Sequence, residues 1–132
     1  MKTIVLSFCI GIMLTAFTGT AVLAQETADK VKAALDEALK TYIVNVKPDK
    51  NCECNNCTHT YKDAFKITKR QAVAGTLRVW GVAKAYHKSQ FTGSGMGTIE
   101  FYAELKKQGE EVSVSKFKWR KNDCMLYVTL LE

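Results

Sequence analysis

Residues 99–106 have the sequence IEFYAELK, in which every second side chain is apolar. Because successive side chains of a β-strand point to opposite faces, this period of two predicts a strand with one buried face. The side chains expected on that face are Ile99, Phe101, Ala103 and Leu105. The polar side chains between them are expected to face away from the core.

The same alternation continues on both sides of this stretch, from Ala64 onward. It recurs, with turn-forming residues between the segments, in residues 65–68, 77–84, 112–119 and 126–130. Between Val114 and Phe117 the alternation slips by one residue, which predicts a β-bulge. We therefore expect a curved antiparallel sheet of about four to five strands.

An earlier segment has the period of a helix instead. Between residues 31 and 42, apolar side chains recur at steps of three and four, which predicts an amphipathic helix of about four turns. They are Val31, Ala34, Leu35, Ala38, Leu39 and Tyr42. Packing this N-terminal helix on the sheet buries both apolar faces, so the sequence predicts one α+β domain.

The N-terminus has the pattern of a secretory signal. Lys2 precedes the uncharged apolar stretch of residues 4–17, and Val22-Leu23-Ala24 offers the small residues that a signal peptidase accepts. The apolar stretch is short for a membrane span. We therefore expect residues 1–24 to be removed and residues 25–132 to form a secreted or periplasmic domain that does not span the membrane.

Four cysteines remain after that cleavage, and most lie in a polar segment without periodicity. This segment, residues 48–60, predicts a cysteine-rich loop. An even number of cysteines in an oxidising compartment favours two disulfides, with candidates Cys52, Cys54, Cys57 and Cys124. Three pairings are possible. A bond from the loop to Cys124 is favoured because closing a long loop most restricts the unfolded chain.

The same loop allows a different chemistry. Thiolates and an imidazole can surround a metal ion such as zinc, and the alternative ligand set is Cys52, Cys54, Cys57 and His59. Cys54 and Cys57 also have the spacing of a redox pair, although no βαβ unit accompanies them. Because structural disulfides are favoured over both readings, we expect no metal and no cofactor.

A short motif resembles one of the cystatins. Residues 71–75, QAVAG, match the family pattern Gln-x-Val-x-Gly and fall between two predicted strands, after a helix. Trp119 stands in a strand before the last hairpin, loosely like the tryptophan of the family's second hairpin. The resemblance implies a cystatin-like fold that blocks papain-type cysteine proteases, with Gln71, Val73, Gly75 and Trp119 as contact residues. The family's Pro-Trp dipeptide is absent.

Cations alternate with aromatic side chains in residues 116–121, KFKWRK. This pattern suits stacking while neutralising a polyanion, so Lys116, Lys118, Arg120 and Lys121 are candidate contacts. The competing interpretation, which we prefer, places Phe117 and Trp119 in the core and the cations in water. The net charge of +6 is mild, and we expect no nucleic-acid partner.

No motif provides a catalytic constellation, so we expect no catalytic residues. The sequence favours an exported, non-enzymatic binding or accessory protein, stabilised by disulfides, whose partner is an unknown protein or a component of the cell envelope. Three alternatives remain: a cystatin-like inhibitor, a metal-binding or redox module, and a polyanion or envelope binder.

Overall fold

The computed structural model describes residues 27–54, 56–91 and 93–132 of the chain. The predicted signal, residues 1–24, lies outside these ranges. Among the described residues, no helix is long and apolar enough to cross a membrane.

One helix, residues 27–42, precedes a five-stranded antiparallel sheet that is not closed. The predicted α+β class is therefore confirmed. The strands follow one another in the sheet in chain order: β1 Cys57–Val73, β2 Thr76–Ser89, β3 Gly95–Gln108, β4 Glu111–Lys121 and β5 Val128–Leu131. Every neighbouring pair is antiparallel, as short connections require.

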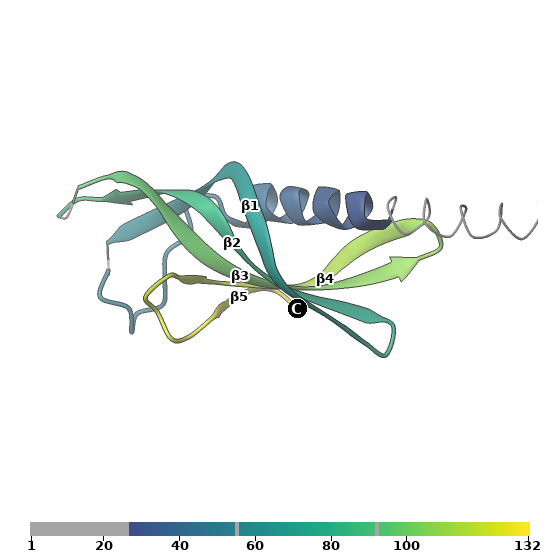
Figure 1. Ribbon diagram of the computed structural model, residues 1–132. Helices are drawn as coiled ribbons and strands as arrows, with labels where there is room; N and C mark the ends of the chain where they lie inside the picture. Colours follow the sequence, from purple (N-terminus) through teal and green to yellow (C-terminus); the bar gives the residue numbers. More distant parts are fainter. Residues whose placement is uncertain (1–26, 55, 92) are drawn as a thin grey trace, which may run out of the picture.

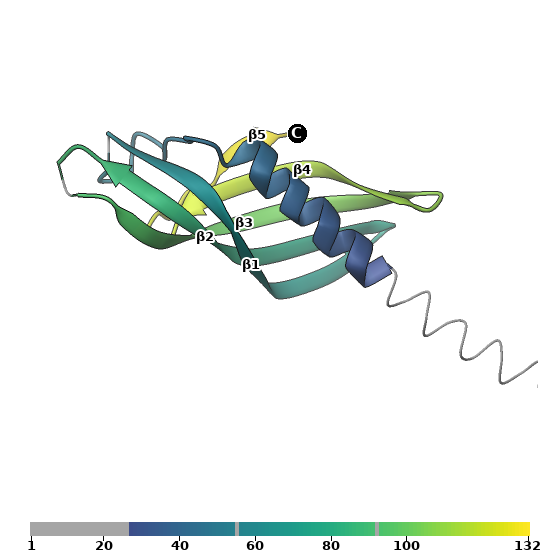
Figure 2. The ribbon, with the colours of Figure 1, turned by 90° about the horizontal axis from the view of Figure 1, so that it is seen from above.

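The helix lies across one face of the twisted sheet (Figures 1 and 2). Its predicted apolar face is the buried one, since Leu35 and Leu39 have no exposed surface. The apolar side chains that alternate along the strands pack against this face of the helix, and the two layers share one core. The largest fully buried sheet residues are Trp119, Phe101, Phe117, Ile99 and Leu105. Burying these side chains supplies most of the energy that holds helix to sheet.

The predicted alternation and bulge are both confirmed. In the pairing of β3 with β4, Glu104 faces Lys116 while Leu105 faces Val114, so Ser115 is the extra residue. The Ser115 hydroxyl donates to the Glu104 carbonyl, 3.2 Å away. The bulge restores Phe117 to the core face of the sheet.

The predicted loop 48–60 is wrong at its C-terminal end, because β1 already begins at Cys57. Cys57, His59 and Tyr61 alternate inward with hardly any exposed surface. The polar side chain of His59 interrupts the apolar alternation in the sequence. Val46 exchanges two backbone hydrogen bonds with His59, which gives this part of β1 an edge partner.

The predicted last strand is also too long, because β5 begins at Val128 and Leu126 is exposed. Residues 122–127 form an irregular connection instead. Cys124 within it is tied by a disulfide to Cys52, and this crosslink holds the connection away from the extended pairing that alternation alone predicts.

The sheet is curved where β1 pairs with β2 (Figure 1), and Gly81 allows close packing at this bend. A Cβ atom on Gly81 would lie 2.5 Å from the Phe101 ring and 2.6 Å from the Lys66 carbonyl oxygen. No other residue type fits between a backbone oxygen and a core ring at this range. Two irregularities interrupt the pairing of β1 with β2, between Tyr61 and Phe65 and between Ile67 and Lys69.

The two ends of the molecule differ in content (Figures 1 and 2). The hairpin end carries the β1–β2 turn at residues 74–75, the β3–β4 turn at residues 109–110 and the first described turn of the helix. The cysteine end carries residues 47–54, the β2–β3 connection and residues 122–127.

Candidate functional site

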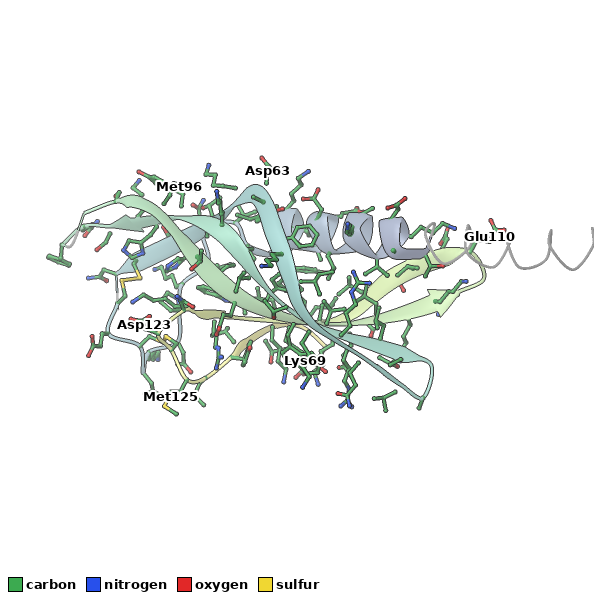
Figure 3. The ribbon with its side chains drawn as sticks, in the orientation of Figure 1. Asp63, Lys69, Met96, Glu110, Asp123 and Met125 are labelled. Carbon is green, nitrogen blue, oxygen red and sulfur yellow. A yellow bond between two sulfur atoms is a disulfide. The ribbon has the colours of Figure 1, made fainter. Side chains whose placement is uncertain are left out.

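All four cysteines of the described chain meet at the cysteine end, where the structure joins Cys52 to Cys124 and Cys54 to Cys57. The Cα atoms are 5.8 Å apart in the first pair and 5.5 Å apart in the second. Figure 3 draws these bonds near the labelled Asp123 and Met125. The long crosslink is one of the loop-to-Cys124 bonds that chain entropy favours.

Both histidines lie beside the cysteines, directly opposite each other in the pairing of β1 with β2. His87 Nδ1 is 3.2 Å from His59 Nε2, within hydrogen-bond range. His59 is only 4% exposed, and its ring lies against Trp119, with 5.3 Å between the ring centroids. His59 Nδ1 is buried and finds no hydrogen-bond partner among the described residues.

The electrostatics keep His59 neutral at pH 7. Burial, reinforced by the charge that His87 and Lys121 can carry nearby, lowers the pKa of His59 to about 4. A neutral imidazole keeps a lone pair on one ring nitrogen. At pH 7 the lone pair of His59 Nε2 is therefore free to accept a hydrogen bond from His87.

Three potential metal ligands converge here: a ligand atom each from Cys54, Cys57 and His87, all within 4.8 Å of one another. This set differs from the predicted alternative of Cys52, Cys54, Cys57 and His59. Cys52 is engaged elsewhere, and His87 reaches the cluster because β2 runs beside β1. His59 contacts His87 instead of completing the set.

The cluster borders an open pocket of about 730 Å³. Cys54, His59 and His87 line one side of it, and the β2–β3 connection lines another. Glu53 and Asp123 add carboxylates to its wall. Small solutes and ions therefore reach Cys54 and His87 from solvent, whereas Cys57 is fully buried.

The hairpin end holds most of the predicted protease contacts. Gln71 and Val73 end β1 on the surface, and the turn that follows has left-handed backbone at Ala74 and Gly75, with φ of 48° and 79°. Two such residues are typical of the tight turn that joins two twisted strands. Trp119, the fourth predicted contact, is fully buried in the core, so its side chain is not presented with the other three.

Two of the four predicted polyanion contacts on β4 are engaged in ion pairs within the protein. Arg120 pairs with Glu100 and its guanidinium lies 4.6 Å from the Tyr127 ring centroid. Lys121 pairs with Asp123 at 3.0 Å. The strand positions opposite Lys116 and Lys118 are Glu104 and Tyr102. Phe117 and Trp119 are buried, as the preferred interpretation predicts.

A set of positive charges without neighbouring acidic residues in the sequence lies on the first hairpin instead, and the motifs considered in the sequence do not include it. The sequence contains no Asp and no Glu between Ala64 and Ile99. The cations of this stretch are Lys66, Lys69, Arg70, Arg78, Lys84 and Lys88. The signal in the sequence is the long stretch without acidic residues that ends at Glu100, not a cluster of lysines. Counting Asp and Glu along the chain would have found this stretch.

Geometry adds an aromatic platform to this charge. The Lys69 ammonium lies 4.7 Å from the Trp80 ring centroid, and Trp80 packs on Tyr102 with 5.1 Å between centroids. Lys66 and Arg70 are also exposed on β1, but Arg70 pairs with core-facing Val79, so it lies on the side of the sheet that faces the helix. Arg78 is the exception, since its Nε lies 3.7 Å from a Glu104 carboxylate oxygen.

No protein-family model, no curated protein and no solved structure matches this chain.

Proposed function

We propose that this chain is an exported, non-enzymatic binding protein that engages an acidic partner through the β1–β2 hairpin. The observation that carries the proposal is the stretch from Ala64 to Ile99, which contains cations and no carboxylate. Export is supported by the signal pattern of residues 1–24 and by two disulfides in the structure.

The hairpin suits an interaction surface because its cations project from two paired antiparallel strands. Lys66, Lys69 and Arg70 are exposed, and the turn after them is exposed as well. Nothing lies within 4 Å of a Cβ placed on Gly75, so a partner can approach the tip closely. An uncompensated positive surface attracts acidic polymers and acidic protein surfaces, and this attraction weakens as salt is added.

The test compares charge reversal on the two hairpins. The triple variant Lys66→Glu/Lys69→Glu/Arg70→Glu alters the first hairpin, and Lys106→Glu/Lys107→Glu/Lys116→Glu makes the same charge change on the second. Binding of the mature protein to immobilised dextran sulfate is measured by surface plasmon resonance over a range of salt concentrations. We expect the first variant to lose at least about tenfold more affinity than the second.

Equal losses in the two variants would mean that only net charge attracts the polymer, and the proposed surface would be wrong. Absence of wild-type binding at low salt would remove the acidic-partner proposal altogether. Circular dichroism of both variants excludes unfolding as the cause of a loss.

A second candidate function is cystatin-like inhibition of a papain-type protease. The observation that favours it is the position of Gln71, Val73 and Gly75 on an exposed hairpin tip. The buried Trp119 argues against it, because one of the four implied contacts is withdrawn. Papain activity measured with micromolar mature protein decides between the candidates. Reversible inhibition that Val73→Asp abolishes would favour the inhibitor, and unchanged activity would exclude papain as a target.

A further inference from the structure

The cysteine end holds a set of ligand atoms that neither proposed function uses. Cys54, Cys57 and His87 each offer one ligand atom, and all of these lie within 4.8 Å of one another. In a tetrahedral zinc site, with Zn–S near 2.3 Å and Zn–N near 2.0 Å, neighbouring ligand atoms are about 3.5–3.8 Å apart. Small side-chain rotations therefore bring this set to zinc-binding distances once the sulfurs are separate.

We propose that the Cys54–Cys57 disulfide opens by exchange with a dithiol and that the reduced pair, together with His87, binds a thiophilic d¹⁰ metal ion such as Zn²⁺. In the exchange, the dithiol is oxidised to its own disulfide while the Cys54–Cys57 bond is reduced to two thiols by the same two electrons. Zn²⁺ then displaces the two thiol protons, which pass to solvent.

The two disulfides close loops of very different length. Cys54 and Cys57 are three residues apart in sequence, whereas Cys52 and Cys124 are 72 apart. A crosslink over so short a loop restricts the unfolded chain much less than one over the long loop. Opening the short bridge therefore leaves the cysteine end tied to the rest of the fold by Cys52 and Cys124.

A hydrogen-bond acceptor for the Cys57 thiol of the reduced state is already present. The Cys57 sulfur is fully buried and lies 3.1 Å from the Cys54 carbonyl oxygen, an acceptor for a thiol proton. Cys54 is only half-buried and borders the open pocket, so an attacking thiolate reaches its sulfur first. Attack there forms a mixed disulfide with Cys54 and frees Cys57 as the leaving group.

His59 serves as a positioning residue for His87. Metal-binding histidines usually have their second ring nitrogen held by a hydrogen bond, which fixes the ring orientation. His87 Nδ1 makes such a contact with His59 Nε2 at 3.2 Å, so its other nitrogen stays available. His59 is itself nine-tenths buried and strongly packed, which gives the contact a rigid base.

Three protein ligands leave the fourth zinc position to water or to a solute. Zinc sites with an open position of this kind bind exchangeable ligands. The pocket beside the cluster connects that position to solvent, and the carboxylates of Glu53 and Asp123 line it. Lys121 lines the pocket as well and pairs with Asp123, so the pocket wall carries charges of both signs.

The test uses the mature protein after brief treatment with dithiothreitol and anaerobic removal of the reagent. Mass spectrometry with thiol labelling selects conditions in which two thiols form while the Cys52–Cys124 bond remains. Co²⁺ is then added as a spectroscopic probe, and Zn²⁺ affinity is measured by displacement. We expect one metal ion per chain with thiolate-to-cobalt charge-transfer absorption, and no such binding in the oxidised protein.

Variants assign the ligands. His87→Asn should lose more than about 100-fold in Zn²⁺ affinity, beyond the 10–100-fold range that outer-sphere changes typically cost. The neighbouring exposed residue provides the matched control, and Lys88→Asn should bind as the wild type does. Cys54→Ser and Cys57→Ser should each abolish the cobalt absorption.

Three results would overturn the proposal: no metal binding by the reduced wild type with its fold intact, equal binding by the oxidised protein, or unchanged affinity in His87→Asn. If His87→Asn does not fold, X-ray absorption of the zinc-loaded wild type replaces it. A first shell with two sulfurs and an imidazole supports the assignment, and a shell without imidazole contradicts it.

Discussion

The cysteine end and the hairpin end of this sheet are stabilised by different means. At the cysteine end, irregular backbone is held by two disulfides and by the contact of the buried His59 with His87. At the hairpin end, regular strands run to tight turns without any crosslink among the described residues. Irregular segments leave many conformations open to the unfolded chain, so they need covalent restraint where a hairpin does not.

The hairpin end is itself uneven. The β3–β4 turn is tied to the helix, because Lys30 Nζ donates to the Glu110 carbonyl at 2.8 Å. The β1–β2 turn leans instead on its own strand pairing, which runs without interruption from Lys69 to Val73. The cationic hairpin is therefore the more independent of the two, as a contact surface for a partner requires.

The largest expected effect comes from removing the long crosslink. Cys52→Ser/Cys124→Ser should lower the free energy of unfolding by about 4 kcal/mol, because the reduced loop spans 72 residues. Cys54→Ser/Cys57→Ser, which opens a loop of three, should cost about 2 kcal/mol or less. Urea melts under non-reducing conditions measure both. Equal losses would show that the cysteine end does not depend on the long bridge.

The second largest loss of stability is expected at Gly81, at the base of the cationic β1–β2 hairpin. Gly81→Ala inserts a methyl group against the Phe101 ring and a backbone oxygen, and we expect a loss of about 3 kcal/mol. Gly95→Ala is the matched control, because nothing lies within 4 Å of its Cβ position. A Gly81→Ala variant as stable as the Gly95→Ala variant would mean that the bend relaxes freely.

The histidine pair makes the cysteine end sensitive to acid. In the unfolded chain histidine titrates near pH 6.5, whereas burial lowers the pKa of His59 to about 4 in the fold. Because the unfolded chain takes up the proton first, stability present above about pH 6.5 is lost as the pH falls toward 4. The loss from this group should be on the order of 2 kcal/mol.

Unfolding free energies of the wild type and His59→Gln, measured at pH 7 and pH 4.5 with a chelator present, test this sensitivity. The difference between the two pH values should be smaller in the variant. Titration of carboxylates such as Asp36 contributes equally to both proteins and cancels in the comparison. The same pH slope in both would mean that burial does not lower the pKa of His59 in the fold.

Sequence periodicity predicted the helix, the central strands and the bulge at Ser115, because those segments bury apolar side chains at regular steps. It failed at the start of β1, where the buried residues include the polar His59 and a cysteine expected in a loop, Cys57. It failed again near Leu126, where a crosslink overrides alternation.

The metal-ligand cluster was beyond sequence reasoning for a different reason. Counting residue by residue from the Val73–Thr76 pair at the turn would place Lys62 opposite His87. The two irregularities in β1 shift the pairing, so that His59 takes this place. A register that depends on bulges cannot be read from alternation, and the proximity of His87 to Cys54 and Cys57 follows only from the structure.

The smallest expected effect on stability belongs to the tip of the cationic hairpin. Val73 is 38% exposed, so Val73→Asp removes little buried surface and should cost less than about 1 kcal/mol. Val79→Asp on the neighbouring strand is the matched control, because Val79 is fully buried and its charge would have no partner in the core. That variant should fail to fold or lose more than about 4 kcal/mol. Thermal melts compare the two, and binding to dextran sulfate is measured on Val73→Asp. If the tip contacts the acidic partner, the added carboxylate should weaken binding while the melting temperature stays nearly constant. A large drop in melting temperature would instead show that the tip is part of the packed structure, and the contrast between a restrained cysteine end and a free hairpin end would not hold.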